Sequence, residues 1–229
     1  MNHTWLEREY SLIGEEAVKK LTNASVLVFG CGGVGGYTIE ALARAGVGRL
    51  NVVDNDTVNE TNINRQIIAT RKTIGQLKTE AIRDRIADIN PDCVVECISI
   101  FADESNITQI IDKADPDFIV DAIDSVTSKL LIAQYAAEKN IPIIASMGTG
   151  NKLDPERLKI ADISKTHTCP LARVMRRELG IRGIKHLTVL FSDEPPVKVC
   201  SRTPASISFV PSAAGLIIAG YVIRKVIEK

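Results

Sequence analysis

Short apolar runs and amphipathic stretches alternate over the first two thirds of the chain. Runs typical of buried strands lie at 25–29, 49–53, 93–100, 117–121 and 142–146. Stretches with apolar residues at helical spacing flank them, at 15–21, 37–45, 78–88, 106–113 and 126–138. Because strands that alternate with helices pair in parallel, the pattern predicts an α/β fold with a Rossmann-like, doubly wound and mostly parallel sheet.

The pattern changes after Gly150. Residues 157–163 and 187–191 alternate like antiparallel strands, and a basic helix is expected between them at 170–179. We therefore expect a Rossmann-like nucleotide-binding domain with an N-terminal helical arm over 1–150. A smaller substrate and dimer region is expected over 151–229, with a C-terminal helix that returns to the sheet.

Composition narrows the class of protein only slightly. The 229 residues are 45% apolar and 24% charged, with 28 basic and 28 acidic side chains, so any contact with nucleic acid must come from a local patch. The five cysteines form no C-x-x-C pair, which argues against zinc and against a disulfide framework. We expect free thiols in a cytoplasmic protein.

The two ends of the chain bear on its location. The first 14 residues carry two glutamates and no apolar core, unlike a signal peptide. The most apolar stretch near the C-terminus, 213–223, has 11 residues, against the roughly 20 of a spanning helix. A buried or dimer-facing helix is the preferred interpretation, without stable membrane insertion, and peripheral attachment to a membrane through this helix stays open.

Closely spaced glycines follow the first expected strand, at Gly30, Gly32, Gly33 and Gly35. Glycine permits positive φ and a close approach of the backbone to phosphate. The helix that follows offers unpaired N–H groups and the positive end of its dipole to an anion. The motif therefore predicts a nucleotide site at the first strand–helix connection.

Asp54 ends the second expected strand, 19 residues past Gly35, near the spacing of a ribose-binding carboxylate. It and Asp56 could instead cap or shape a turn. Glycines and a carboxylate alone fit a nicotinamide- or flavin-dependent oxidoreductase. The polar loop that follows adds Arg65 and Lys78, and converging cations suit the breakage of a phosphoanhydride better than hydride transfer.

Five motifs in order resemble the ThiF/MoeB/HesA superfamily of adenylating enzymes, which is related to ubiquitin-activating enzymes. They are G-x-G-G-V-G at 30–35, D-x-D-x-V at 54–58, N-x-x-R-Q at 62–66, G-x-x-K at 75–78 and D-x-x-D-S at 121–125. The resemblance implies an ATP site in which Asp54 holds the ribose hydroxyls. It also implies that Asp124 binds Mg²⁺ beside the α-phosphate.

The same resemblance implies roles for the remaining residues of the site. Asn62, Arg65 and Lys78 hold the triphosphate, and Arg8 reaches the ATP of a neighbouring subunit, so that a homodimer completes the active site. The expected nucleotide-contacting residues are Gly30, Gly32, Gly33, Gly35, Asp54, Asp56, Asn62, Arg65, Gln66, Lys78, Asp124 and Ser125. The expected catalytic residues are Arg65, Lys78, Asp124 and, in trans, Arg8.

Simpler interpretations exist for several of these residues. Arg65 could form a surface ion pair, and Arg8 could be solvated near the terminus. Lys78 is harder to explain without an anion, because a helix start is an unfavourable place for a cation. Asp124 comes just after an expected strand, at the edge where open α/β sheets bind their ligands.

The second half of the chain resembles the tRNA threonylcarbamoyladenosine dehydratases of this superfamily. The matching segments lie at 162–171, 174–179, 206–212 and 214–220. The resemblance implies that ATP adenylates the threonyl carboxylate of the modified nucleoside and that the tethered carbamoyl nitrogen then displaces AMP. It implies ATP, Mg²⁺ and a tRNA substrate, whereas a monovalent cation and sulfur-relay partner proteins stay open.

A basic cluster in this half fits a tRNA partner. Its members fall within 13 positions, and the only acidic residue among them is Glu178. They are Arg173, Arg176, Arg177, Arg182 and Lys185. The first three share one helix face, which predicts a patch that contacts phosphates; a solvated helix face is the alternative.

Three other residues invite a chemical role. Cys169 stands where we expect an aspartate in many relatives, and a buried or incidental thiol is preferred over a nucleophile. His167 and His186 are too isolated in the sequence to be assigned as acid or base.

Other functions remain as alternatives. An activator of a ubiquitin-like sulfur-carrier protein of the ThiS/MoaD type is disfavoured by the missing C-x-x-C pairs. An NAD-dependent oxidoreductase would bind NAD tightly and ATP weakly. A catalytically silent scaffold is disfavoured by the full set of acidic and basic site residues.

Overall fold

A seven-stranded sheet in the order β3-β2-β1-β4-β5-β7-β6 runs through the computed structural model, which describes residues 4–200 and 203–228. Its strands are β1 Ser25–Phe29, β2 Arg49–Val53, β3 Val94–Ile98, β4 Phe118–Asp121, β5 Ile143–Ser146, β6 Leu158–Asp162 and β7 Thr188–Ser192. All neighbours pair in parallel except β6, which lies antiparallel to β7 at one edge. The predicted α/β fold class is confirmed.

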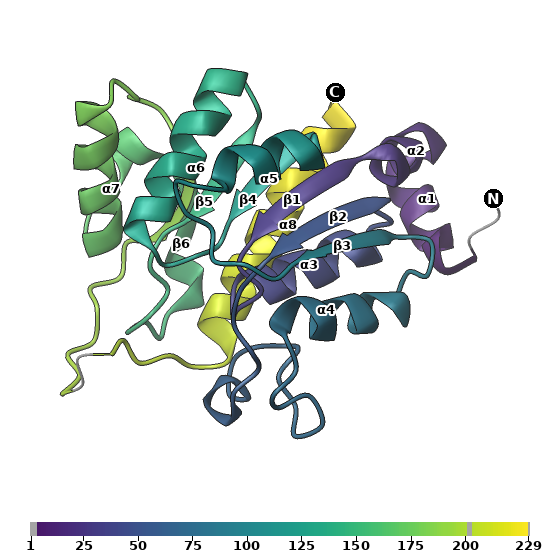
Figure 1. The fold of residues 1–229 in the computed structure, drawn as a ribbon, viewed down its shortest axis with the longest axis horizontal. Coiled ribbons are helices and arrows are strands. Elements are labelled where there is room, and N and C mark those ends of the chain that lie inside the picture. Colours follow the sequence, from purple (N-terminus) through teal and green to yellow (C-terminus); the bar gives the residue numbers. More distant parts are fainter. Residues whose placement is uncertain (1–3, 201–202, 229) are drawn as a thin grey trace.

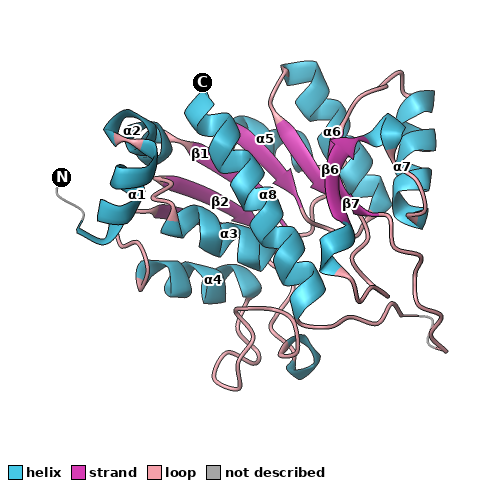
Figure 2. Cartoon of the chain, turned by 180° about the vertical axis from the view of Figure 1, so that it is seen from behind, coloured by secondary structure: helices cyan, strands magenta, loops and turns pink. Residues whose placement is uncertain are grey.

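Helices cover both faces of the sheet (Figures 1 and 2). They are α1 Glu7–Ile13, α2 Glu15–Asn23, α3 Gly35–Arg44, α4 Lys78–Ala87, α5 Ile107–Ala114, α6 Val126–Lys139, α7 Pro170–Ile181 and α8 Phe209–Glu228. Helices α5 and α6 lie on one face, and α3, α4 and α8 lie on the other. Central strands that have helices on both faces are typically apolar throughout. In β1, Val26 to Phe29 are fully buried.

The sheet continues past the expected boundary at Gly150. Strand β7 extends it beside β5, and α8 returns along α3 on the face opposite α5. A Cβ atom on Gly215 of α8 would lie 2.4 Å from the backbone oxygen of Val34, and Thr38 Oγ1 donates to the Gly215 carbonyl at 3.0 Å. The two parts share one sheet. The expected division into a nucleotide-binding part before residue 150 and a substrate and dimer part after it therefore stays a prediction.

Helix α8 is longer than the apolar run that predicted it. It spans 20 residues, so the argument from an 11-residue run underestimated its length. By length and composition it could cross a membrane, but Ala214, Ile218 and Val222 are fully buried against the sheet. The side of α8 that faces the sheet is therefore buried, as the sequence analysis expected of this helix.

Helices α1 and α2 form the expected N-terminal arm. Helix α2 leads directly into the first residue of β1, so the arm lies at the amino ends of the strands (Figure 1). The argument against a signal peptide also covered residues 1–3, which lie outside the described residues.

Candidate active site

The glycine turn joins the carboxyl end of β1 to α3, and two of its glycines are required by close packing. Gly30 has φ +93°, and a Cβ there would lie 2.7 Å from the Ala122 oxygen. A Cβ on Gly35 would lie 1.8 Å from the Gly30 oxygen. Gly32 is different, because its nearest neighbour is the Gln66 amide nitrogen at 3.7 Å. The turn therefore leaves space beside Gly32 and none beside Gly35.

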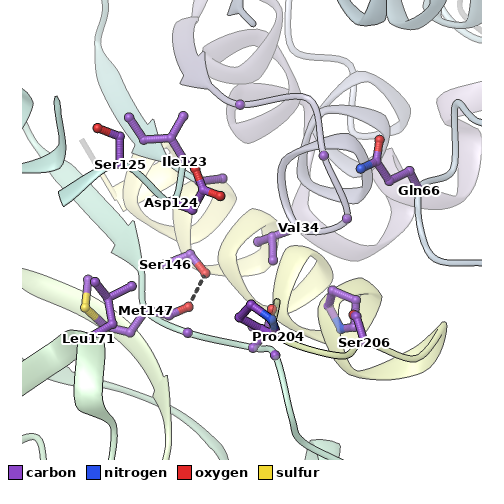
Figure 3. A pocket seen from close by; sticks show the side chains of 18 of the residues that line it. Val34, Gln66, Ile123, Asp124, Ser125, Ser146, Met147, Leu171, Pro204 and Ser206 are labelled. Carbon is purple, nitrogen blue, oxygen red and sulfur yellow. Dashed lines mark hydrogen bonds between the residues drawn. The ribbon is translucent and has the colours of Figure 1, made fainter. Parts of the chain in front are cut away.

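A cavity of about 710 Å³ opens at this turn, along the carboxyl edge of the sheet. Figure 3 shows Asp124 and Ser125 on the β4 side of it and Gln66 across from them. Most of the expected nucleotide-contacting residues line this cavity. They are Gly30, Gly32, Gly33, Asp54, Asp56, Asn62, Arg65, Gln66, Lys78, Asp124 and Ser125.

Asp54 is fixed against the glycine turn. One carboxylate oxygen accepts the Cys31 backbone N–H at 2.8 Å, and the other accepts the Asp56 N–H at 2.9 Å. The residue therefore shapes a turn, as the simpler interpretation has it, and also faces the cavity. Each oxygen keeps a lone pair for a further donor, such as a sugar hydroxyl.

Lys78 is the first residue of α4 and is 6% exposed. Its ammonium group lies 2.6 Å from a carboxylate oxygen of Asp56 and 4.0 Å from one of Asp54. These carboxylates offset the unfavourable position of a cation at a helix start. In this structure Asp56 is thus the direct partner of Lys78.

The loop between β2 and α4 brings the remaining polar side chains. Asn62 Oδ1 accepts the Asn59 N–H at 3.0 Å and caps a single 3₁₀ turn. Arg65 is held by the Thr61 carbonyl at 2.9 Å. Gln66 is 7% exposed, and its Oε1 has no hydrogen-bond partner among residues 4–200 and 203–228. A buried acceptor without a partner at the cavity wall is suited to a ligand donor.

Asp124 follows β4 and is exposed to the cavity, with no hydrogen bond or ion pair to the rest of the described chain. Ser125 caps α6 by accepting the Ser128 N–H at 3.4 Å. Below this turn the fully buried Lys129 binds Asp121 at 2.9 Å and the Ile123 carbonyl at 3.2 Å. The turn that presents Asp124 is therefore anchored from inside the protein.

The described residues contain no group of three or more metal-binding side chains. Mg²⁺ at a nucleotide site is held by one or two carboxylates together with phosphate oxygens and water. A free Asp124 carboxylate beside the glycine turn fits that donor set.

Two expected site residues lie away from the cavity. Gly35 does not line it and serves the packing of α3 against the turn instead. Arg8 is exposed on α1, at the amino ends of the strands, so it does not reach the cavity of this chain.

Only some side chains of the basic cluster lack partners within the described protein. Arg176 donates to the Thr166 carbonyl at 2.9 Å. Glu178 pairs with Arg177 at 2.8 Å and with Arg182 at 3.2 Å. Arg173 and Lys185 are exposed, and neither has an ion-pair partner within the ranges that the structure describes. Arg173 and Arg176 also line a separate cavity of about 250 Å³ at the start of α7.

One wall of the main cavity was missed by the sequence analysis. It comprises the loop after β5, the start of α7 and a segment before α8. Figure 3 shows Met147 and Leu171 at one side of the cavity, and Pro204 and Ser206 at another. The signal was Gly148-Thr149-Gly150 directly after a strand, a glycine-rich loop at the ligand-binding edge that we treated as a boundary.

The Cys31 thiol, in the glycine turn, is not activated. Burial and the neighbouring Asp54 carboxylate hold the pKa of Cys31 well above its usual value. Cys93 precedes β3 and does not line the cavity; burial raises its pKa to about 11. A neutral thiol is a poor nucleophile, so nothing in the surroundings of Cys31 indicates thiol catalysis.

Comparison with known proteins assigns the family. Residues 6–229 match the model of the ThiF family, and the chain belongs to this family. It is 42% identical to the tRNA threonylcarbamoyladenosine dehydratase of Bacillus subtilis, over 100% of this chain and 96% of that protein. The family resemblance inferred from the motifs is confirmed.

Solved structures agree with this assignment. The fold matches the crystal structure of E. coli tRNA N6-threonylcarbamoyladenosine dehydratase, TcdA, in complex with AMP, with a TM-score of 0.93 and 32% identity. The match covers 99% of this chain and 96% of that one. The complex of the same enzyme with ATP matches with a TM-score of 0.92, at the same identity and coverage. These relatives favour the dehydratase over the carrier-protein activator and the oxidoreductase.

Proposed function

We propose that this protein is an ATP-dependent tRNA threonylcarbamoyladenosine dehydratase. The observation that carries the proposal is the cavity, which runs from the glycine turn and its cations to a second end at Met147 and Leu171. Such a shape accommodates a nucleotide at one end and a second substrate at the other. The identity of 42% to a dehydratase over the whole chain supports the same reaction.

The reaction needs no enzyme nucleophile. A carboxylate oxygen of the threonyl group forms a bond to the α-phosphorus of ATP, and the bond between the α- and β-phosphates breaks, which releases pyrophosphate. The carbamoyl nitrogen then attacks the activated carbonyl carbon and loses its proton, and AMP leaves. Because the nitrogen is already tethered, ring closure is an intramolecular reaction with a high effective molarity.

The cavity residues divide this work. Asp54 holds the ribose, while Gly32 and Gly33 let the backbone approach the phosphates. Arg65 and Lys78 neutralise the charge that develops on the leaving pyrophosphate. When ATP binds, the Lys78 ammonium group would give up part of its contact with Asp56 for contacts with phosphate oxygens.

Mg²⁺ belongs to the proposal through Asp124. The ion supplies charge neutralisation at the phosphates when bound, and Asp124 is the free carboxylate that would hold it. The side-chain amides of Asn62 and Gln66 would donate N–H groups to phosphate oxygens, and the unpartnered Gln66 Oε1 would accept from a ligand hydroxyl or amino group. The monovalent cation of the sequence analysis has no assigned residues and stays a prediction.

The proposed assembly is a homodimer in which Arg8 acts in the active site of the other subunit. The position of α1 far from its own cavity supports this arrangement. The exposed Arg173 and Lys185 support tRNA binding beside the second end of the cavity, with Arg176 holding the helix in place. Sulfur-relay partners, a cytoplasmic location and peripheral membrane contact through α8 stay predictions.

The test is a reaction of the purified protein with ATP, Mg²⁺ and threonylcarbamoylated tRNA. We expect the nucleoside to lose the mass of one water, with AMP and pyrophosphate released in equal amounts. Unmodified tRNA is the control and should release no AMP. Unchanged nucleoside mass, or release of ADP in place of AMP, would contradict the proposal.

A further inference from the structure

Lys152 is a buried lysine in the wall of the cavity to which the proposed reaction assigns no role. It lies in the segment that joins β5 to β6, and its side chain is 4% exposed. Buried lysines are rare, because removal of an ammonium group from water is costly unless a partner compensates. The position of this residue in a ligand cavity therefore requires an explanation.

Hydrogen bonds to Glu194, which follows β7, hold Lys152 and the residues after it in place. The Lys152 ammonium group donates to the backbone carbonyl of Glu194. The Glu194 carboxylate accepts the backbone N–H groups of Leu153 at 3.0 Å and Asp154 at 3.0 Å. Glu194 itself is 9% exposed. Its carboxylate is therefore occupied by the backbone and does not pair with the ammonium group.

The charge of Lys152 consequently lacks a balancing anion. In the described ranges, 4–200 and 203–228, its ammonium group has one hydrogen bond and no ion pair. Two of its three N–H donors are left for other partners. Burial lowers the pKa of Lys152, opposed by the nearby Cys169 and Glu194. An anionic ligand in the cavity would supply the missing partner.

The lysine belongs to the end of the cavity away from the phosphate cations. Lys152 and Cys169 line the same cavity, and while burial lowers the pKa of Lys152, the nearby Cys169 raises it. The Cys169 thiol lies 3.9 Å from where a Cβ on Gly148 would be. Met147 and Leu171 form the same end, on the side away from Gln66 (Figure 3). An anion at Lys152 is therefore a different group from the phosphates at the glycine turn.

We infer that Lys152 binds the carboxylate of the acceptor substrate, an inference that rests on the proposed function. In that reaction a carboxylate must approach a negatively charged α-phosphate. An ammonium group beside the carboxylate reduces their repulsion, keeps the carboxylate ionised and orients it for attack. Lys152 is thus a substrate-binding residue for the carboxylate, and Glu194 is a positioning residue that sets its direction.

The test uses two variants that separate charge from structure. Lys152→Gln keeps a donor for the Glu194 carbonyl and removes the charge, and Lys152→Arg keeps the charge. We expect the glutamine variant to lose about tenfold to a hundredfold in kcat/KM for threonylcarbamoylated tRNA, as for a lost charge-assisted hydrogen bond. The arginine variant should recover most of this loss, and the Kd for ATP should change less than about twofold in both.

The matched control is Lys113→Gln, an exposed lysine on α5 outside the cavity, which should behave as the wild type. If Lys152→Gln does not fold, as judged by its Tm, Lys152→Met takes its place. Wild-type kcat/KM in the uncharged variant, equal losses in the glutamine and arginine variants, or a parallel loss of ATP binding would overturn the inference. A wild-type enzyme that fails to cyclise the nucleoside would instead refute the proposed function and the inference with it.

Discussion

In the glycine turn, different glycines serve different purposes: some are needed for backbone packing, and others leave room for a ligand. Gly35 is enclosed by backbone and does not line the cavity, Gly32 faces the cavity, and Gly30 lines the cavity while its Cβ position is blocked by backbone. The sequence motif predicted all of them as nucleotide contacts, because spacing alone does not reveal which glycine meets protein and which meets ligand. The same limit applies to Asp56, whose ion pair with Lys78 across 22 positions depends on the folded loop.

A pair of alanine substitutions tests this division. Gly35→Ala must displace the Gly30 carbonyl and should destabilise the protein by about 1–3 kcal/mol or more, as overpacking does. Gly32→Ala has room and should keep the wild-type Tm, but its methyl group should weaken ATP binding. Thermal unfolding and ATP titration measure both effects. Equal Tm losses in the two variants would refute the assignment.

At the scale of elements, periodicity predicted the strands and helices well. β1 and β2 occur at the predicted residues, since four of the five residues of each strand are buried and most of these are apolar. β3 is shorter than the predicted 93–100, since it ends at Ile98 and Ile100 lies beyond it in the cavity lining. The loop after β5 was missed as part of the site, since its glycines look the same in a linker and in a binding loop.

The edge pair β6–β7 carries a pH-sensitive contact. The ammonium group of Lys159 and the guanidinium group of Arg157 lower the pKa of Asp193 from 3.8 to about 2. A lowered pKa stabilises the fold above pH 3.8, and this contribution is lost as the pH falls from 3.8 to about 2. Asp193→Asn should therefore lower the Tm at pH 7 and flatten its fall between pH 4 and pH 2.

The control for this measurement is Asp88→Asn, an exposed aspartate at the end of α4, which should leave the pH dependence unchanged. An Asp193→Asn protein whose Tm follows the wild-type curve at every pH would show that the contact does not stabilise the fold.

For the whole molecule, the topology places the N-terminal arm and the cavity at opposite ends of the strands. The family resemblance implied only that Arg8 reaches the site of the neighbouring subunit, and the position of one arginine near a terminus could not show this. If Arg8 acts in the other subunit, each active site combines residues of two chains, as closed symmetric dimers permit.

Mixed dimers test this arrangement. Arg8→Ala and Lys78→Ala should each be inactive alone. After subunit exchange, a heterodimer regains one site with both residues intact, and a random mixture should show about a quarter of the wild-type activity. If the mixture stays inactive although exchange is complete, Arg8 does not act in trans.

The central claim is that the threonyl carboxylate attacks the α-phosphate of ATP. The most direct test uses tRNA whose threonyl carboxylate carries a heavy oxygen isotope in both positions. Because the bridging oxygen stays on phosphorus when the carbamoyl nitrogen displaces AMP, the account predicts AMP with one heavy oxygen. Label in inorganic phosphate, or AMP without label, would contradict it.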